Sequence, residues 1–398
     1  MEDGGDYVMD FEPDVFENKF IHWSKLPSHV KIQVLRNLPY PTLRNFMFLS
    51  KECWALASMF KTEAYAVYLD EMAFISELQD TPCEEKSMDL FVYYIPPDSR
   101  GIPNSHKTYQ LSFVEDEDGG CSVRRVRGKR GRKRYSEGVR YSNETYFSAS
   151  MRAFFQLTKF IEAEELAIEM HTMSPEVGNI LRELPLTPSF SCKSFLIRTE
   201  DKALPPLLLP FIAPGCKLAV YSFPFPEPGD IFMNTAFFDS EVLRAAPSFD
   251  TEALTGVTEE QLLLLQGSRI CMKAPNISSK GINGILRAVT TFSQCSPQIF
   301  SPDAVEYWLQ WFEGQRRIEL ISLRETQILN HNEVLDSIDP VRILSWAEVL
   351  RNFSPTMREQ WEHPNPGFRA GIRNRSGILV VVNVGTNYCD ITDPFLNE

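Results

Sequence analysis

The sequence predicts a mixed α+β / α/β chain, in which a small segment of three helices precedes a larger body of alternating strands and helices. Three observations support this class. Apolar residues recur at helical spacing between residues 23 and 60, where prolines separate short runs. Strand-like and helix-like segments alternate from about residue 148 onward. The chain has 398 residues, of which 43% are hydrophobic, so it can bury a sizeable core.

The first stretch, residues 1–20, is predicted to be an acidic tail, and it lacks the apolar run of a signal peptide. No apolar run in the chain is long enough to cross a bilayer. The eight cysteines are scattered, with no CxxC pair, which favours reduced thiols. We therefore expect a protein of the cytoplasm, the nucleus or both, without a membrane partner.

The three-helix segment occupies residues 21–65. Its first helix is predicted by apolar residues that recur every four positions, at Leu26, Val30, Val34 and Leu38. We expect Ser28 and Ser50 to cap the first and third helices, because a serine hydroxyl accepts first-turn N–H groups. Pro39 and Pro41 are expected to separate the first helix from the second.

A segment of about forty residues cannot bury enough apolar surface to be stable by itself. Two interpretations follow. Its apolar side chains pack on one another and on a further helix, predicted over residues 63–78, or they are buried in the groove of a partner protein.

Residues 66–147 are predicted to connect this segment to the body through that further helix and a β-hairpin. Residues 89–95 are rich in aromatic and branched side chains, which favours a strand. The hairpin is predicted by alternating polarity in residues 108–116 and 121–127, with Gly119 and Gly120 in the turn.

A basic loop is predicted at residues 124–134, where eight of eleven residues are Lys or Arg. It is interpreted as a solvated loop balanced by the acidic residues 115–118, as a nuclear-import signal or as a phosphate-binding element. The net charge of −13 counts against broad affinity for nucleic acid. The basic residues are Arg124, Arg125, Arg127, Lys129, Arg130, Arg132, Lys133 and Arg134.

Residues 148–390 are predicted to form a repeat-like α/β body that begins with a helix over 148–166 and closes with a hairpin turning at 374–377. Candidate strands recur at intervals of about 21 to 31 residues. A strand–helix unit of roughly 20–29 residues has the size of a leucine-rich-type repeat. We therefore predict a leucine-rich-repeat-like solenoid, with an ordinary open α/β sheet as the alternative. The strand centres are Ala167, Phe195, Leu218, Phe249, Ile270, Gln298, Glu319 and Ile343.

Motifs for catalysis or cofactors are not found in the sequence. It contains no GxGxxG, no phosphate-binding GxxxxGK, no GxSxG and no HxxxH. The acidic pairs Glu164-Glu165 and Glu259-Glu260 are expected to be solvated or capping charges at helix edges. The sequence therefore predicts a non-catalytic protein without a cofactor or a metal site.

The three-helix segment resembles an F-box. The resemblance is carried by the pair Leu26-Pro27, the spaced apolar helix, a second leucine at Leu43, and a third helix bearing Lys51 and Trp54. Two residues separate Lys51 from Trp54, where one is usual in the family. The layout of most of residues 150–390 is similar to that of nematode F-box proteins with an FTH homology region.

The resemblance implies a substrate-recognition subunit of an SCF-type (Skp1–cullin–F-box) ubiquitin ligase. Its F-box would dock on the Skp1 adaptor, and through it on a cullin–RING ligase, while the body would select a protein substrate. The alternative function is that of a nuclear, nucleic-acid-associated protein using the basic loop. The resemblance implies that this chain contacts Skp1 through Leu26, Pro27, Val30, Val34, Leu35, Leu38, Leu43 and Trp54.

Overall fold

The chain divides into two compact units. One comprises Met1–Glu63 with Lys159–Glu162, and the other comprises Ala64–Thr158 with Ala163–Glu398. The computed structural model describes residues 23–38, 40–47, 49–78, 86–94, 108–117, 120–127, 134–135, 138–184, 189–223, 229–290, 318–354, 358, 367–373 and 377–395.

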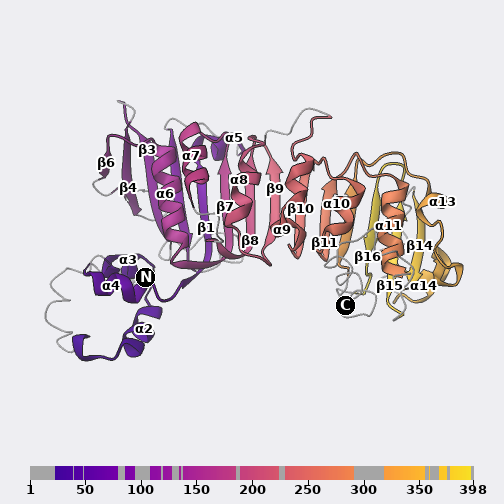
Figure 1. The fold of residues 1–398 in the computed structure, drawn as a ribbon, viewed down its shortest axis with the longest axis horizontal. Helices are drawn as coiled ribbons and strands as arrows, with labels where there is room; N and C mark the ends of the chain where they lie inside the picture. The colour runs from indigo at the N-terminus through magenta and orange to yellow at the C-terminus, as the bar shows by residue number, and fades with distance from the viewer. Residues whose placement is uncertain are drawn as a thin grey trace, which may run out of the picture. The chain divides into compact units, whose positions relative to one another are not determined.

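The described part of the first unit is mainly helical (Figure 1), and it also includes the strand residues 62–63 and 161–162. Pro41 is the second residue of a helix, where the missing N–H of proline costs no intrahelical hydrogen bond. The elements are η1 (Trp23–Lys25), α2 (Ser28–Arg36), α3 (Tyr40–Met47) and α4 (Lys51–Ala57).

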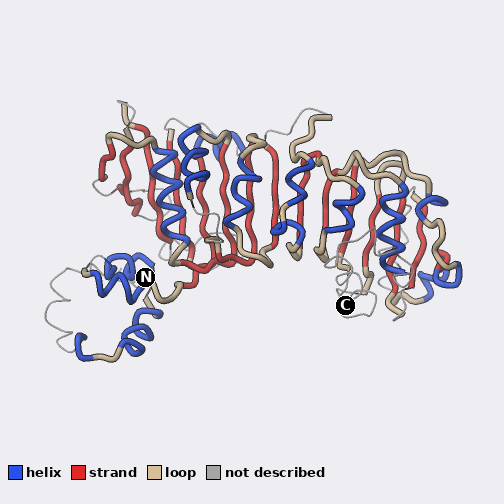
Figure 2. Tube along the Cα trace, in the orientation of Figure 1, coloured by secondary structure: helices blue, strands red, loops and turns tan. Residues whose placement is uncertain are grey.

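The second unit is built on one mixed sheet, coloured red in Figure 2. Its described strands are neighbours in the order β13-β14-β15-β16-β12-β11-β10-β9-β8-β7-β1-β2-β3-β4-β5, and β6 pairs with β4. Strands β1 to β8 are Thr62–Glu71, Ser87–Tyr93, Thr108–Glu115, Cys121–Arg127, Arg134–Tyr135, Val139–Tyr141, Ile161–Met170 and Ser191–Thr199. Strands β9 to β16 are Lys217–Ser222, Ser248–Leu254, Arg269–Lys273, Leu320–Arg324, Ile343–Ser345, Phe368–Arg373, Leu379–Val384 and Cys389–Thr392.

The centre of the sheet is parallel. Each of the strands β8 to β11 pairs in parallel with the next strand along the chain, so the parallel series ends at β12. Lys193 of β8 pairs with Glu164 of β7. Arg198 of β8 pairs with Glu169 of β7 at the same sequence offset, which parallel strands require. The connections contain α7 (Pro175–Glu183), α8 (Leu204–Leu208), α9 (Glu241–Arg244), α10 (Glu259–Leu264) and α11 (Ser279–Thr290).

Most of the predicted strand centres lie in this parallel series. The centres at Ala167, Phe195, Leu218, Phe249 and Ile270 fall within β7 to β11 and are confirmed. Glu319 directly precedes β12. Ile343 begins β13, which pairs antiparallel with β14 and so does not extend the parallel series. Gln298 lies outside the described residues.

Antiparallel strands flank the centre on both sides. The predicted hairpin of residues 108–127 is confirmed, because β3 and β4 pair antiparallel with Glu115 opposite Cys121. The closing hairpin is confirmed as well, since β14 and β15 pair antiparallel. Strand β16 then pairs with β15 and, on its other side, with β12. The last parallel strand is therefore covered by the final strand of the chain.

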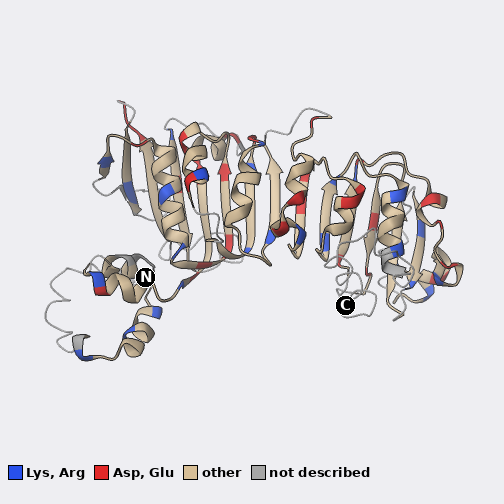
Figure 3. Ribbon diagram, viewed as in Figure 1, with Lys and Arg blue, Asp and Glu red and all other residues tan. Residues whose placement is uncertain are grey.

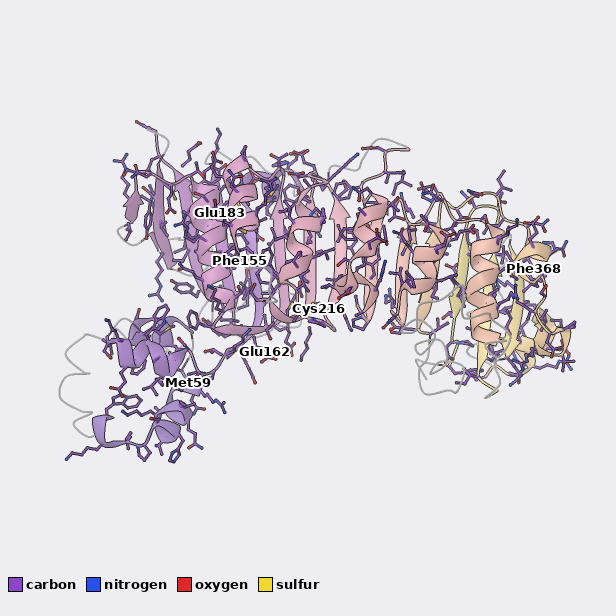
Figure 4. The ribbon with its side chains drawn as sticks, viewed as in Figure 1. Met59, Phe155, Glu162, Glu183, Cys216 and Phe368 are labelled. Atoms are coloured by element: carbon purple, nitrogen blue, oxygen red, sulfur yellow. The ribbon has the colours of Figure 1, made fainter. Side chains whose placement is uncertain are left out.

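Helices α6 (Tyr146–Thr158) to α11 cover one face of the sheet (Figure 1). An aromatic cluster forms the core beneath them. The ring of Phe155, labelled in Figure 4, lies 4.9 Å from that of Phe190 and 5.0 Å from that of Phe211. The Phe190 ring stacks on Phe195 of β8 at 5.3 Å. The Phe195 side of the sheet is thus the helix-covered side.

The helix predicted over residues 63–78 is wrong for its first part. Residues 62–71 form β1, and only Met72–Leu78 is helical, as α5. Ala66, Val67 and Leu69 are fully buried there, between neighbouring strands β2 and β7. Pairing along both edges and burial of the side chains outweigh the helix propensity of this segment.

The helix predicted over residues 148–166 ends at Thr158, and β7 begins at Ile161. The pair Glu164-Glu165 therefore lies in a strand, where the hydroxyl of Tyr68 donates to Glu165 at 3.0 Å. The pair Glu259-Glu260 does lie in the first turn of a helix, as predicted for capping charges.

Candidate partner-binding site

The helices of the first unit begin and end for local reasons. Ser50 is the N-cap of α4, and its hydroxyl accepts a hydrogen bond from the Cys53 backbone N–H at 3.1 Å, as predicted. The predicted Ser28 cap is wrong. Pro27 holds the N-cap position of α2 without a side-chain hydrogen bond, and Ser28 is the first helical residue.

A small core holds these helices together. Leu35 of α2, Leu43 of α3 and Leu56 of α4 are 1%, 0% and 5% exposed. The rings of Trp23 and Phe46 meet edge to face, with centroids 5.4 Å apart. Each helix therefore contributes at least one side chain to a shared interior.

An ion pair links α2 to α4. The Lys31 side chain is only 5% exposed, and its ammonium nitrogen lies 2.9 Å from a carboxylate oxygen of Glu52. The same ammonium lies 5.8 Å from the centroid of the Trp23 ring. The lysine thus crosses the interior and holds its charge between an anion and an aromatic face.

The predicted Skp1-facing residues separate into three groups. Leu35 and Leu43 are buried within the chain, which fits the interpretation that they pack on their own helices. Leu26, Val30 and Leu38 are half-buried, and Pro27 is exposed. Val34 is 40% exposed and Trp54 is 47% exposed, which leaves both side chains accessible to a partner.

Two further large apolar side chains are more exposed than Val34 and Trp54. Leu49 is 62% exposed and Met59, labelled in Figure 4, is 64% exposed. Leu49 precedes α4 and Met59 follows it, so helical periodicity could not select them. The signal that could have found them is a large apolar residue immediately outside a helix end. Together with Val34 and Trp54 they supply apolar area that a partner can cover.

The basic loop begins later than predicted. Strand β4 extends to Arg127 and β5 begins at Arg134, so Arg124 and Arg125 are strand residues. Both are half-buried, and the Arg125 guanidinium lies 5.3 Å from the centroid of the Tyr109 ring. Lys129, Arg130, Arg132 and Lys133 lie outside the described residues. An import signal here stays a prediction.

The described part of the chain offers little for metal or thiol chemistry. It holds no group of three or more His, Cys, Asp or Glu side chains placed to bind a metal ion. None of its six cysteines forms a disulfide, and the Sγ atoms of Cys192 and Cys216 lie 3.2 Å apart. Burial raises the pKa of the Cys121 thiol to about 11. Among the described helices, none is long and apolar enough to cross a membrane.

Comparison with known proteins places the helical segment in a family. Neither curated proteins nor solved structures gave a significant match to the chain. Residues 23–55 match the model of the F-box domain. These residues span η1, α2, α3 and most of α4. F-box proteins are generally non-catalytic substrate adaptors, and an F-box suggests a Skp1-binding adaptor of SCF ubiquitin ligases. The match over residues 23–55 supports an F-box protein.

Proposed function

We propose that the chain is a substrate-recognition subunit of an SCF-type ubiquitin ligase. One observation carries the proposal: residues 23–55 match the F-box domain, and this segment exposes large apolar side chains. Val34, Leu49 and Trp54 lie within the matched range and are 40–62% exposed. Burial of such side chains in a partner groove is the usual source of affinity for an amphipathic helical segment.

In this proposal the body selects a protein substrate, and the ligase supplies the chemistry. The chain would hold a substrate lysine close to a ubiquitin-conjugating enzyme that carries ubiquitin, which is catalysis by proximity. The body takes the role of the FTH-like, leucine-rich-repeat-like receptor that the sequence predicts, and the protein acts in the cytoplasm, the nucleus or both. The consecutive order of strands β7 to β12 supports a repeat-like receptor.

Co-purification with Skp1 tests the adaptor role, and the chain provides matched controls. Val34→Asp and Leu49→Asp place a charge on exposed apolar positions of the F-box. Val341→Asp and Ile328→Asp do the same on the body, where these side chains are 87% and 84% exposed. We expect the first two to abolish Skp1 capture and the last two to leave it unchanged. Failure of the unmodified protein to capture Skp1, or equal loss in all four variants, would overturn the proposal.

A further inference from the structure

The face of the sheet opposite helices α6 to α11 carries polar and aromatic side chains. Side chains alternate between the two faces of a strand, so the neighbours of the buried Phe195 and Ile197 point the other way. Arg198 of β8 is one of these. We call this side, which lies opposite the described helices α6 to α11, the helix-free face. On strands β1, β2, β7, β8, β9 and β10 it includes Tyr68, Asp70, Asp89, Phe91, Tyr93, Glu165, Glu169, Leu196, Arg198, Tyr221, Asp250 and Glu252.

Two carboxylates face each other on this side. Asp70 of β1 and Asp89 of β2 are direct cross-strand partners. Side chains in that position are close neighbours, and like charges there destabilise a sheet. Asp89 is only 3% exposed, and Gln110 of β3 donates to it through Nε2 at 2.6 Å. In the part of the chain that is described, no hydrogen bond or ion pair reaches the Asp70 carboxylate, which remains partly exposed.

The negative charge around Asp70 exceeds the positive charge that the nearby Arg198 supplies. Glu169 of β7, the neighbour of β1 on its other side, is held by Arg198 at 2.9 Å. The pKa of Asp70 is raised well above its usual range by burial and then by the negative charges of Glu169 and Asp89. The Arg198 guanidinium acts in the opposite direction and is too weak to cancel them. Asp70 thus lies where a second cation would be stabilised.

Aromatic rings lie on the same face of the sheet as Asp70. The Tyr68 and Tyr93 rings lie 5.4 Å apart, and Phe91 stacks parallel to Tyr93 at 5.9 Å. Tyr221 of β9 lies opposite Arg198 and within 6.0 Å of its guanidinium. Contact with solvent alone does not account for aromatic residues on this face of the sheet. Rings beside carboxylates fit the apolar stem and charged head of a lysine or arginine side chain.

We propose that the helix-free face around Asp70 and Asp89 is a docking surface for a Lys/Arg-rich segment of a protein partner. A basic head group would pair with the partly exposed Asp70, the buried Asp89 beside it would add its negative charge, and the alkyl stem would lie against Tyr68, Phe91 and Tyr93. Because the carboxylates follow one another from strand to strand, at about 4.8 Å per strand, an extended segment crossing the strands can reach several of them. Taking this partner to be the ubiquitination substrate rests on the proposed function above.

The charge of the partner follows from complementarity. Asp70 is faced by Asp89 from β2, by Glu169 from β7, by Arg198 from β8 and by Tyr93 at the end of β2. Because Asp70 must be ionised to attract a cation, affinity for a basic segment should rise as the pH is raised through its pKa. An acidic segment would show the opposite dependence, so the pH profile reports the sign of the partner.

The test measures fluorescence anisotropy of a labelled Lys/Arg-rich nonapeptide on the full chain bound to Skp1, or on the full chain alone. Asp70→Asn is expected to weaken binding at least about tenfold, because it removes the anion that pairs with the basic head group. Asp89→Asn is expected to weaken binding less, because the buried Asp89 acts on the peptide only through its negative charge. Glu183→Gln, on the exposed C-terminal end of α7 (Figure 4), is the matched control and should stay within about twofold. Urea midpoints verify that each variant is folded.

Equal loss in Glu183→Gln, no loss in either aspartate variant, or displacement of the peptide by millimolar Ca²⁺ would overturn the proposal. The first outcome would show only general attraction to an acidic protein, and the last would show a metal site. The two proposals fail separately. Loss of Skp1 capture with retained peptide binding would overturn the ligase role alone, whereas retained Skp1 capture without peptide binding would overturn the docking surface alone.

Discussion

The ammonium nitrogen of Lys31 lies 2.9 Å from a carboxylate oxygen of Glu52, so a nearly buried cation in α2 depends on an exposed anion in α4. The two side chains are 5% and 68% exposed. This asymmetry makes Glu52 the residue through which solvent and salt can act on the interior of the F-box.

We expect Glu52→Gln to loosen the packing of α2 on α4, because it leaves the Lys31 charge in the interior without an anion. Since Glu52 is exposed and screened, the expected loss of stability is about 1 kcal/mol or less. Hydrogen exchange of the α2 and α4 amides would measure it, with a larger effect at low salt. Glu63→Gln, at another exposed carboxylate of the same unit, is the control. Identical exchange in both variants would contradict the prediction.

Leu43 and Leu49 should separate folding from partner binding. Leu43 is fully buried, so Leu43→Ala should destabilise the helical unit by about 2–5 kcal/mol through lost burial and a cavity. Leu49 is 62% exposed, so Leu49→Ala should change stability by less than about 0.5 kcal/mol and still weaken Skp1 capture. Amide exchange and Skp1 titration on the same samples distinguish the two effects. A Leu49→Ala protein with full Skp1 affinity would remove Leu49 from the surface.

Asp70→Asn should make the body more stable at neutral pH. The raised native pKa means that the folded chain holds this proton to a higher pH than the unfolded chain does. Ionisation of Asp70 therefore lowers the free energy of unfolding as the pH rises between the unfolded and the native pKa. The variant should exceed the unmodified protein in urea midpoint at neutral pH. The difference should shrink as the pH falls through the native pKa.

The same substitution is expected to weaken binding of the basic peptide, so stability and binding should change in opposite directions. That combination cannot arise from unfolding. Glu183→Gln should change neither quantity. A lower urea midpoint for Asp70→Asn at neutral pH would show that the carboxylate supports the fold.

Substitution of two glycines by alanine should change the stability of the protein in opposite directions. A Cβ on Gly371 of β14 would lie 2.4 Å from Val349 Cγ2 and 2.9 Å from Leu379 Cδ1, inside a small apolar cluster. Gly371→Ala should therefore cost about 1–3 kcal/mol through overpacking. A Cβ on Gly284 of α11 would lie 3.5 Å from Leu263, which is ordinary contact. Gly284→Ala should stabilise by up to about 1 kcal/mol, because alanine favours a helix. Thermal unfolding of the two variants would show shifts of opposite sign.

The sequence allowed the strand–helix alternation of the body to be predicted, because those strands are short apolar runs bounded by turns or helices. Strand β1 was not predicted, because its extended conformation depends on pairing with β7, which is distant in the chain. The Thr62 backbone N–H donates to the Phe160 carbonyl at 2.7 Å, across nearly a hundred residues. Local propensity does not contain such a contact.

The same limit applies to the candidate sites. Leu35 and Leu43 match the F-box pattern, but the pattern does not state which of its leucines face inward. The opposition of Asp70 and Asp89 requires the register between β1 and β2, and the first of these strands was predicted to be a helix. The charge of both residues is visible in the sequence (Figure 3 shows acidic residues on several strands of the body), whereas their adjacency is a property of the sheet.

Strand β16 joins β12 to β15, and this has a consequence for how the protein is made. Strands β13 to β15 leave the ribosome before β16, but they reach the parallel series only through it. Until Thr392 has been synthesised, the free edge of β12 is a template for pairing with other chains. A chain that lacks β16 thus exposes an aggregation-prone edge of β12, which β16 covers in the folded sheet.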